Sequence, residues 1–212
     1  MDDIKRNTAE ILLKIGAVEF RPENPFSYAS GLKGPIYCDN RKLLSHPAER
    51  AKICDYFCET LKASGIAYDH LAGLATAGIP HAAFIADRLN ESMVYVRSKP
   101  KAHGRRNQIE GDYSEGQRLF LVEDLVNQGA SLNEALLGVE DAGLKAVGCL
   151  SIVTYQMEAS QEVLKSWSLP LHSLTDFNSL CDAALEMNLI SAEGKDQLID
   201  WQRDPKAWSN KN

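Results

Sequence analysis

The amino-acid sequence predicts an α/β protein built on a parallel sheet that helices flank. Three observations predict this fold. Apolar segments of strand character alternate with segments of helical periodicity from residue 71 to residue 153, two adjacent carboxylates follow the apolar run at 119–122, and a turn with one glycine then leads into a helix. Strands alternating with helices in this way are typical of a parallel sheet covered on both faces.

Size and composition indicate a globular protein. The 212 residues suffice for one domain with a small appendage, and 44% of them are hydrophobic and 25% charged. No apolar run approaches the ~20 residues of a membrane-spanning helix, and the first residues, MDDIKR, do not resemble a signal peptide. The formal net charge of −6 argues against nucleic acid or an anionic membrane as a partner.

The cysteines indicate a reducing compartment. Their number, 5, is odd, and none are paired with C-x-x-C spacing. We therefore expect free thiols, a cytoplasmic location and no structural zinc.

The N-terminal part predicts two helices separated by short strands. Apolar positions between residues 4 and 15 share one helical face, and Gly16 follows as a stop. Residues 18–40 are rich in Pro, Gly, Ser and aromatic residues, which is typical of short strands and turns. Pro47 suits the first position of a helix that ends near Gly65.

The central part predicts alternating strands and helices. Ser131 with Glu134 fits a capping box at the start of one helix, which ends near Gly143. The expected strands are 71–75, 93–97, 119–122 and 146–153, and the expected helices are 80–90 and 132–142.

The C-terminal part predicts two short helices, at 178–190 and 191–203, after a linker at 167–175 that contains Pro170. Three parts follow from this pattern. They are an N-terminal helix with short strands and turns (1–45), an α/β core (46–175) and a C-terminal helical tail packed on the core (176–212).

A basic segment lies between two of the predicted strands. From residue 97 to residue 106 the chain has no acid, and it carries Arg97, Lys99, Lys101, His103, Arg105 and Arg106. It belongs to a stretch of about 20 residues without periodicity, and loops of that length are usually functional or disordered. We interpret it as a lid that closes over a bound anion. A solvated surface hairpin is the alternative.

Glu123 and Asp124 are the main candidate site residues. A parallel strand would deliver them to the carboxyl edge of the sheet, where open α/β sheets bind ligands. The turn after them can surround an anion with main-chain N–H groups at a helix N-terminus. Carboxylates for hydroxyl groups beside amides for a phosphate indicate a site for a phosphorylated sugar.

Several segments together resemble one family. LVEDLVNQGAS at 121–131 resembles the diphosphoribosyl-binding signature of the type I phosphoribosyltransferases. FSYASGLKGPIYCDNR at 26–41, ATAGIPHA at 75–82, YVRSKPKAHG at 95–104 and NQIEG at 107–111 resemble the hood, diphosphate loop and lid of the orotate phosphoribosyltransferases. The resemblance covers residues 20–155 and implies the type I phosphoribosyltransferase fold with a small N-terminal hood.

The resemblance also implies a reaction. It is the transfer of ribose 5-phosphate from 5-phosphoribosyl 1-diphosphate to orotate, which gives orotidine 5′-phosphate and diphosphate in de novo pyrimidine (UMP) biosynthesis. It implies Mg²⁺, held mainly by substrate oxygens and water with no protein metal ligand named, and a homodimer in which the lid serves the neighbouring subunit's site. The implied catalytic residues are Lys101, His103 and Asp124.

The resemblance assigns binding roles to further residues. For orotate they are Asn127, Tyr37 and Ser30, with ordinary strand packing as the alternative for Tyr37. For 5-phosphoribosyl 1-diphosphate they are Arg97, Lys101, His103, Glu123, Asp124, Leu125, Val126, Asn127, Gln128, Gly129, Ala130, Ser131, Thr76 and Ala77.

The sequence departs from the family pattern in the turn. The family usually has Ser or Thr, then Thr, where this chain has Asn127 and Gln128. The departure leaves two alternatives to an active enzyme of this kind. One is a non-catalytic regulator that binds phosphoribosyl diphosphate with the same fold. The other is a purine-salvage phosphoribosyltransferase.

Overall fold

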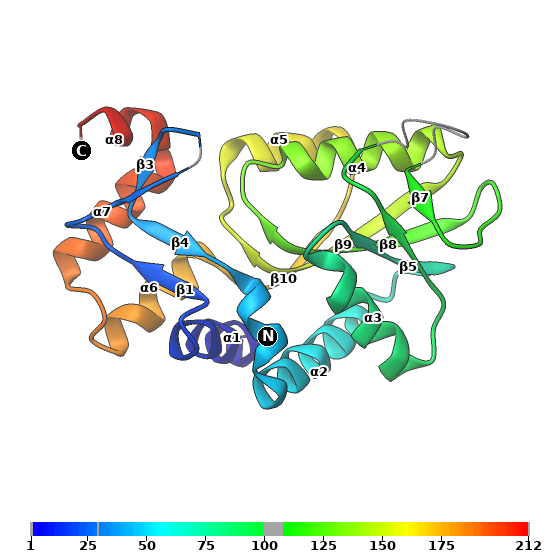
Figure 1. Ribbon diagram of the computed structural model, residues 1–212, viewed down its shortest axis with the longest axis horizontal. Coiled ribbons are helices and arrows are strands. Elements are labelled where there is room, and N and C mark those ends of the chain that lie inside the picture. Colours follow the sequence, from blue (N-terminus) through cyan, green and yellow to red (C-terminus); the bar gives the residue numbers. More distant parts are fainter. Residues whose placement is uncertain (1, 29, 100–107, 212) are drawn as a thin grey trace. The chain divides into compact units, whose positions relative to one another are not determined.

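The structure, a computed structural model, describes residues 2–28, 30–99 and 108–211 (Figure 1). The chain forms two compact units. One comprises Arg50–Leu174, and the other comprises the residues up to Glu49 together with those from Thr175 onward.

A six-stranded sheet organises the larger unit, with strand order β10-β9-β8-β5-β6-β7 (Figure 1). Its central pairs β6–β5, β5–β8 and β8–β9 are parallel, and β7 lies antiparallel to β6. The strands are β5 (His70–Leu74), β6 (Met93–Val96), β7 (Ile109–Glu110), β8 (Arg118–Val126), β9 (Lys145–Thr154) and β10 (Leu171–Asp176). The helices are α2 (Pro47–Ser64), α3 (Gly78–Leu89), α4 (Ala130–Asp141) and α5 (Glu158–Ser166). The prediction of a parallel α/β sheet is confirmed.

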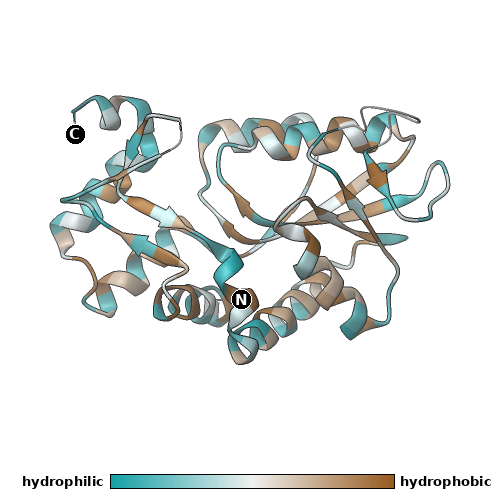
Figure 2. Ribbon diagram, in the orientation of Figure 1, coloured by the Kyte–Doolittle hydropathy of each residue, from teal (hydrophilic) through white to brown (hydrophobic). Residues whose placement is uncertain are grey.

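The core explains why the strands are apolar. Leu119–Val122 of β8 are all fully buried, as expected for a strand between two parallel neighbours that helices cover on both faces. Leu132, Leu136 and Val139 of α4 pack in the same cluster as residues of β5, β6 and β8. In Figure 2 the strands of this sheet accordingly contain brown stretches, the colour of hydrophobic residues.

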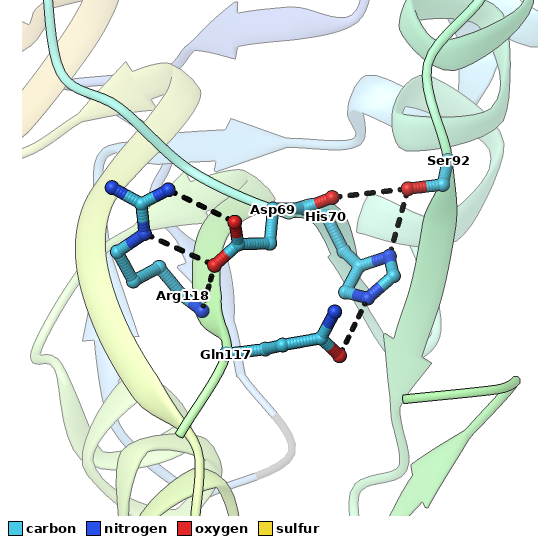
Figure 3. Close-up of polar contacts among 5 residues, drawn as sticks. All are labelled: Asp69, His70, Ser92, Gln117 and Arg118. Atoms are coloured by element: carbon cyan, nitrogen blue, oxygen red, sulfur yellow. Dashed lines mark hydrogen bonds and ion pairs between the residues drawn. The ribbon is translucent and has the colours of Figure 1, made fainter. Parts of the chain in front are cut away.

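A polar network joins the amino ends of β5 and β8 (Figure 3). The Arg118 guanidinium donates to both carboxylate oxygens of Asp69, at 3.0 and 2.9 Å, and the Arg118 main-chain N–H donates to Oδ2 at 2.7 Å. These hydrogen bonds hold the pKa of the Asp69 carboxyl well below its usual range. Beside them, the His70 ring lies between Ser92 Oγ, 2.8 Å from Nδ1, and Gln117 Oε1, 3.0 Å from Nε2.

The smaller unit combines short hairpins with helices. β1 (Val18–Phe20) pairs antiparallel with β4 (Ile36–Cys38), and β2 (Phe26–Ser27) pairs antiparallel with β3 (Lys33–Gly34). Its helices are α1 (Asp2–Lys14), the 3-10 helix η1 (Asn40–Ser45), α6 (Phe177–Glu186), α7 (Ala192–Arg203) and α8 (Pro205–Lys211).

Contacts within the smaller unit connect its N-terminal and C-terminal segments. Lys5 Nζ lies 2.7 Å from Asp176 Oδ2, and Arg6 Nη2 lies 2.6 Å from Glu186 Oε2. The predicted hood and tail segments therefore belong to one unit. The predicted packing of the tail on the 46–175 core stays a prediction.

The structure corrects four details of the predicted elements. The strand expected at 119–122 continues through both acids to Val126, because β9 pairs with it along that length. Ser131 lies inside α4, whose N-cap is Gly129, so the predicted capping box is wrong. The predicted linker at 167–175 contains β10, an edge strand of the sheet. The tail has a third helix, α8.

Among the described residues, no helix combines the length and the apolar character that crossing a membrane requires.

Candidate active site

Candidate residues gather where the parallel strands end. Thr76 and Ala77 follow β5, Arg97 follows β6, and Glu123 and Asp124 lie in the last part of β8. Because β5, β6 and β8 are parallel neighbours, these residues lie along the carboxyl edge of the sheet. That edge is where open α/β sheets bind ligands.

The two acids have different surroundings. The two acids are adjacent in β8, and their carboxyl groups are close enough to interact. Glu123 is only 9% exposed, whereas Asp124 is half-buried. Glu123 Oε1 accepts a hydrogen bond from the Asp124 main-chain N–H at 2.9 Å. Burial, together with the neighbouring Asp124 carboxyl, raises the pKa of Glu123 well above its ordinary value. Glu123 therefore keeps its proton to a higher pH than an exposed glutamate does.

The start of α3 lies directly against the acid pair. A Cβ on Gly78 would come within 2.2 Å of the Val122 carbonyl oxygen and 3.3 Å of Glu123 Cα, so only glycine fits there. The turn before it exposes Thr76 and leaves Ala77 half-buried, and the Ala75–Thr76 peptide bond is cis. This contact brings the turn after β5 beside the carboxylates of β8.

His81 of α3 is a neighbour of the site that sequence reasoning missed. It is 3% exposed, and its ring centroid lies 6.2 Å from that of Phe57. Burial lowers its pKa to about 4, against the opposing charge of Asp124. A neutral imidazole therefore lies within electrostatic range of Asp124. Because His81 lies on a mostly apolar helix face, the sequence gave no sign that it would lie near Asp124.

The turn at 127–131 leads from β8 into α4. Gly129 has φ 84°, and a Cβ there would come within 3.0 Å of Ser160 Cα, so both conformation and space require glycine. Gln128, Ala130 and Ser131 are exposed. α4 has no side-chain cap at Gly129, so its first N–H groups suit an anion.

Other residues of this segment are less accessible. Leu125 is half-buried, and Val126 is buried with its carbonyl accepting from Tyr155 N–H at 2.9 Å. Asn127 Oδ1 is buried and has no hydrogen-bond partner in the part of the chain that the structure describes. Such an atom is costly to leave unpaired, so a ligand with a suitable donor would gain from pairing with it.

Arg97 directly follows β6 and places a positive charge at this edge of the sheet. Its Nη1 lies 3.1 Å from Glu110 Oε1, and its side chain is 40% exposed. Lys101 and His103, the predicted catalytic residues of the lid, lie outside the described residues.

The residues predicted to contact a flat base belong to the smaller unit. Tyr37 of β4 is 42% exposed, and its ring centroid lies 5.5 Å from that of Phe26. Ser30 is exposed, and its Oγ accepts from Leu32 N–H at 3.5 Å. Tyr28 instead donates its hydroxyl to the Ile36 carbonyl, and burial raises its pKa to about 12.

Comparison with known proteins gives consistent matches. Residues 39–175 match the family model described as phosphoribosyl transferase domain. An orotate phosphoribosyltransferase of Bacillus pumilus is 44% identical over 206 residues, which cover 97% of each chain. That of Bacillus subtilis is 44% identical over 210 residues, covering 98% of this chain and 97% of the relative. The crystal structure of orotate phosphoribosyltransferase from Aeropyrum pernix has a TM-score of 0.70 and 27% identity, covering 86% of this chain and 99% of that one.

Proposed function

The chain belongs to the orotate phosphoribosyltransferases of the phosphoribosyl transferase family, and we propose its chemistry from this membership. The enzyme transfers ribose 5-phosphate from 5-phosphoribosyl 1-diphosphate to orotate, giving orotidine 5′-phosphate and diphosphate in UMP biosynthesis. One observation carries the proposal. The acid pair of β8, the uncapped start of α4 and the turn after β5 lie along one edge of the sheet.

The ribose is proposed to bind at the acid pair. Breaking the bond at C1 develops positive charge on the sugar, which the Asp124 carboxylate would stabilise. Glu123 is the more buried of the two acids, and its carboxyl oxygens would accept a hydrogen bond from a ribose hydroxyl. Of the two acidic residues, Asp124 is thus the proposed catalytic one, through its negative charge, and Glu123 is a proposed binding residue.

The 5′-phosphate is proposed to bind at the turn. Residues 127–131 would supply main-chain N–H groups, with the Ser131 hydroxyl as a further donor. Gln128 is exposed there, and its longer side chain replaces the compact hydroxyl that the family pattern has. Phosphate binding is therefore proposed to be weaker than with threonine, by the worth of about one neutral hydrogen bond, ~1 kcal/mol.

The diphosphate is proposed to lie between the turn after β5 and the end of β6. Thr76 and Ala77 would supply N–H groups, and the Arg97 guanidinium would donate to two oxygens at once. Lys101 and His103 remain the proposed catalytic cations, which would stabilise negative charge on the departing diphosphate. Their contribution is positioning and electrostatic stabilisation rather than covalent chemistry.

Orotate is proposed to meet three residues. Its ring N–H groups are donors that match Asn127 Oδ1, a buried acceptor with no partner among the residues that the structure describes. Tyr37 and Ser30 are proposed as further orotate contacts from the resemblance to the family; Tyr37 is exposed enough to stack on a flat ring, and the Ser30 hydroxyl is exposed.

Magnesium belongs to the same proposal. Two carboxylates beside a ribose and a diphosphate are the oxygen-rich surroundings that Mg²⁺ prefers, with substrate oxygens and water as its main ligands. When bound, Mg²⁺ neutralises part of the charge on the diphosphate. Glu123 and Asp124 would bind the ribose hydroxyls.

Two properties at the level of the whole protein are also proposed. A homodimer with the lid shared between subunits would complete each site with Lys101 and His103 of the neighbouring copy. A cytoplasmic location is also proposed. The five cysteines are free thiols, and the proposed substrates are soluble metabolites.

A direct assay tests the function. Purified protein with orotate, 5-phosphoribosyl 1-diphosphate and Mg²⁺ should consume the absorbance of orotate. Adenine or hypoxanthine in place of orotate should give no product, which separates this enzyme from a purine transferase. Calorimetric binding of the sugar diphosphate without any turnover would contradict the proposal and favour a regulator.

A further inference from the structure

The Arg97 side chain, which the proposed function assigns to the diphosphate, already has an anionic partner in this chain. Its Nη1 lies 3.1 Å from Oε1 of Glu110, and the two side chains are 40% and 25% exposed. In the antiparallel pair of β6 and β7, Tyr95 lies opposite Glu110 and Val96 opposite Ile109. Arg97 therefore continues β6 diagonally across from Glu110, at a distance that long side chains reach.

The main chain of Arg97 is held independently of this ion pair. The Arg97 N–H donates to the Gln108 carbonyl at 2.8 Å, and Gln108 Nε2 donates to the Arg97 carbonyl at 3.0 Å. Gln108 also packs on α4, since a Cβ on Gly138 would come within 2.4 Å of its Oε1. Because these contacts fix the backbone, Glu110 governs the direction and the charge environment of the guanidinium, not the place of Arg97 Cα.

We propose that Glu110 is a positioning residue that holds the Arg97 guanidinium at the carboxyl end of β6 until a diphosphate group replaces the Glu110 carboxylate as its partner. The proposal rests on the proposed function for the identity of that anion. Glu110 acts through Arg97 and makes no contact with the reacting atoms.

Two opposite effects of Glu110 follow from its position. Its carboxylate orients a flexible side chain, which lowers the entropy lost when the anion binds. It also carries a negative charge next to the place where diphosphate must bind, so it competes with the ligand. Replacing the carboxylate by an amide separates the two effects, because an amide oxygen still accepts from the guanidinium but carries no charge.

Calorimetric titration with pyrophosphate and Mg²⁺ tests the proposal. Glu110→Gln should bind pyrophosphate about two- to fivefold more tightly than the wild type, the range expected for a half-exposed ion pair. KM for the sugar diphosphate should fall by a similar factor without an increase in kcat. Equal pyrophosphate affinities of the wild type and Glu110→Gln would overturn the proposal.

Further variants identify the cause. Glu110→Ala removes both the charge and the acceptor and should bind pyrophosphate more weakly than Glu110→Gln does; equal binding would overturn the positioning role. In an Arg97→Gln background, Glu110→Gln should give no gain. Glu186→Gln is the matched control, because Glu186 forms an exposed ion pair with Arg6 and its loss changes the net charge equally. It should change the affinity by less than about twofold.

The outcomes also separate this inference from the proposed function. Normal turnover by the wild type with no effect of Glu110→Gln would contradict the inference alone. A wild type that binds pyrophosphate but never consumes orotate would contradict the function, while the comparison of Glu110 variants still tests the positioning role.

Discussion

Glu123 turns its carboxyl group back to the main-chain N–H of its own neighbour, Asp124, at 2.9 Å from Oε1. The buried Glu123 carboxyl group also lies close to the carboxyl group of Asp124. Both burial and that neighbour favour the protonated form of Glu123. The acid pair is therefore electrostatically asymmetric, with one carboxyl buried and one half-exposed.

Glu123→Gln should change how stability depends on pH. A folded-state pKa above the ordinary 4.5 means that the stability Glu123 contributes is complete below pH 4.5 and is lost as pH rises through the raised pKa. The neutral amide does not have this loss. The free energy of unfolding of the variant, relative to wild type, should thus increase with pH above 4.5. Denaturant melts at a series of pH values measure it, and parallel curves would contradict the assignment.

His81→Phe should remove a loss of stability on the acid side. The ordinary pKa of 6.5 is lowered to about 4 in the folded chain, so the contribution of neutral His81 is present above pH 6.5 and lost as pH falls toward 4. The full difference amounts to about 3 kcal/mol. Phe keeps an aromatic ring beside Phe57 and does not titrate. Chemical denaturation at pH 7, 5.5 and 4 tests this, and an identical acid-side decline in both proteins would show that His81 is not its source.

Gly78→Ala should destabilise the chain and impair the site. The new Cβ would meet the Val122 carbonyl oxygen at 2.2 Å, which forces α3 and β8 apart at a cost of about 1–3 kcal/mol. Gly194→Ala in α7 is the control, because its Cβ would approach side-chain atoms alone, the Pro22 ring at 3.1 Å, Ser191 Oγ at 3.5 Å and Ile190 Cβ at 3.7 Å. Thermal unfolding compares the two, and equal melting temperatures would contradict the close contact.

Gln128→Thr should tighten binding of the sugar phosphate. A compact hydroxyl replaces a long, exposed amide, and one added neutral hydrogen bond is worth ~1 kcal/mol, or about fivefold in affinity. Calorimetry with 5-phosphoribosyl 1-diphosphate measures the change. Weaker binding would mean that Gln128 itself is a ligand for the phosphate.

Lys101→Ala should lower kcat strongly and leave the affinity for the sugar diphosphate nearly unchanged. The interaction of a lid cation with diphosphate strengthens as the leaving group departs, so its loss falls on the transition state. Lys99→Ala, which removes the same charge two residues earlier, should have a smaller effect. Single-turnover kinetics separate binding from chemistry, and an unchanged rate would exclude Lys101 from catalysis.

Local patterns were sufficient to predict most of the fold. The apolar runs near Leu71, Met93, Leu119 and Ala146 each form a strand, because strands covered on both faces need continuous apolar sequence. The turn at Gly129 was also visible, since its glycine and the following helical periodicity are local signals. The edge strand β10 was not, because its residues near Pro170 look like a linker until β9 pairs with them.

The position of the candidate acids was predictable from the sequence, whereas their neighbours were not. The adjacent acids at the end of an apolar run indicated Glu123 and Asp124 directly. The burial of His81 and the pairing of Arg97 with Glu110 depend on residues brought together by the tertiary fold, which no spacing along the chain encodes.

The salt bridge between Asp69 and Arg118 has a consequence at the opposite end of its two strands. A slip of one residue between β5 and β8 would displace Thr76 from Glu123 by about 3.3 Å and reverse the facing of each side chain. The pair opposes that slip from about 16 Å away along β5 and so helps to hold the proposed sugar and leaving-group subsites at a fixed separation. We therefore expect substitutions of Asp69 or Arg118 to change substrate geometry although neither residue belongs to the proposed site.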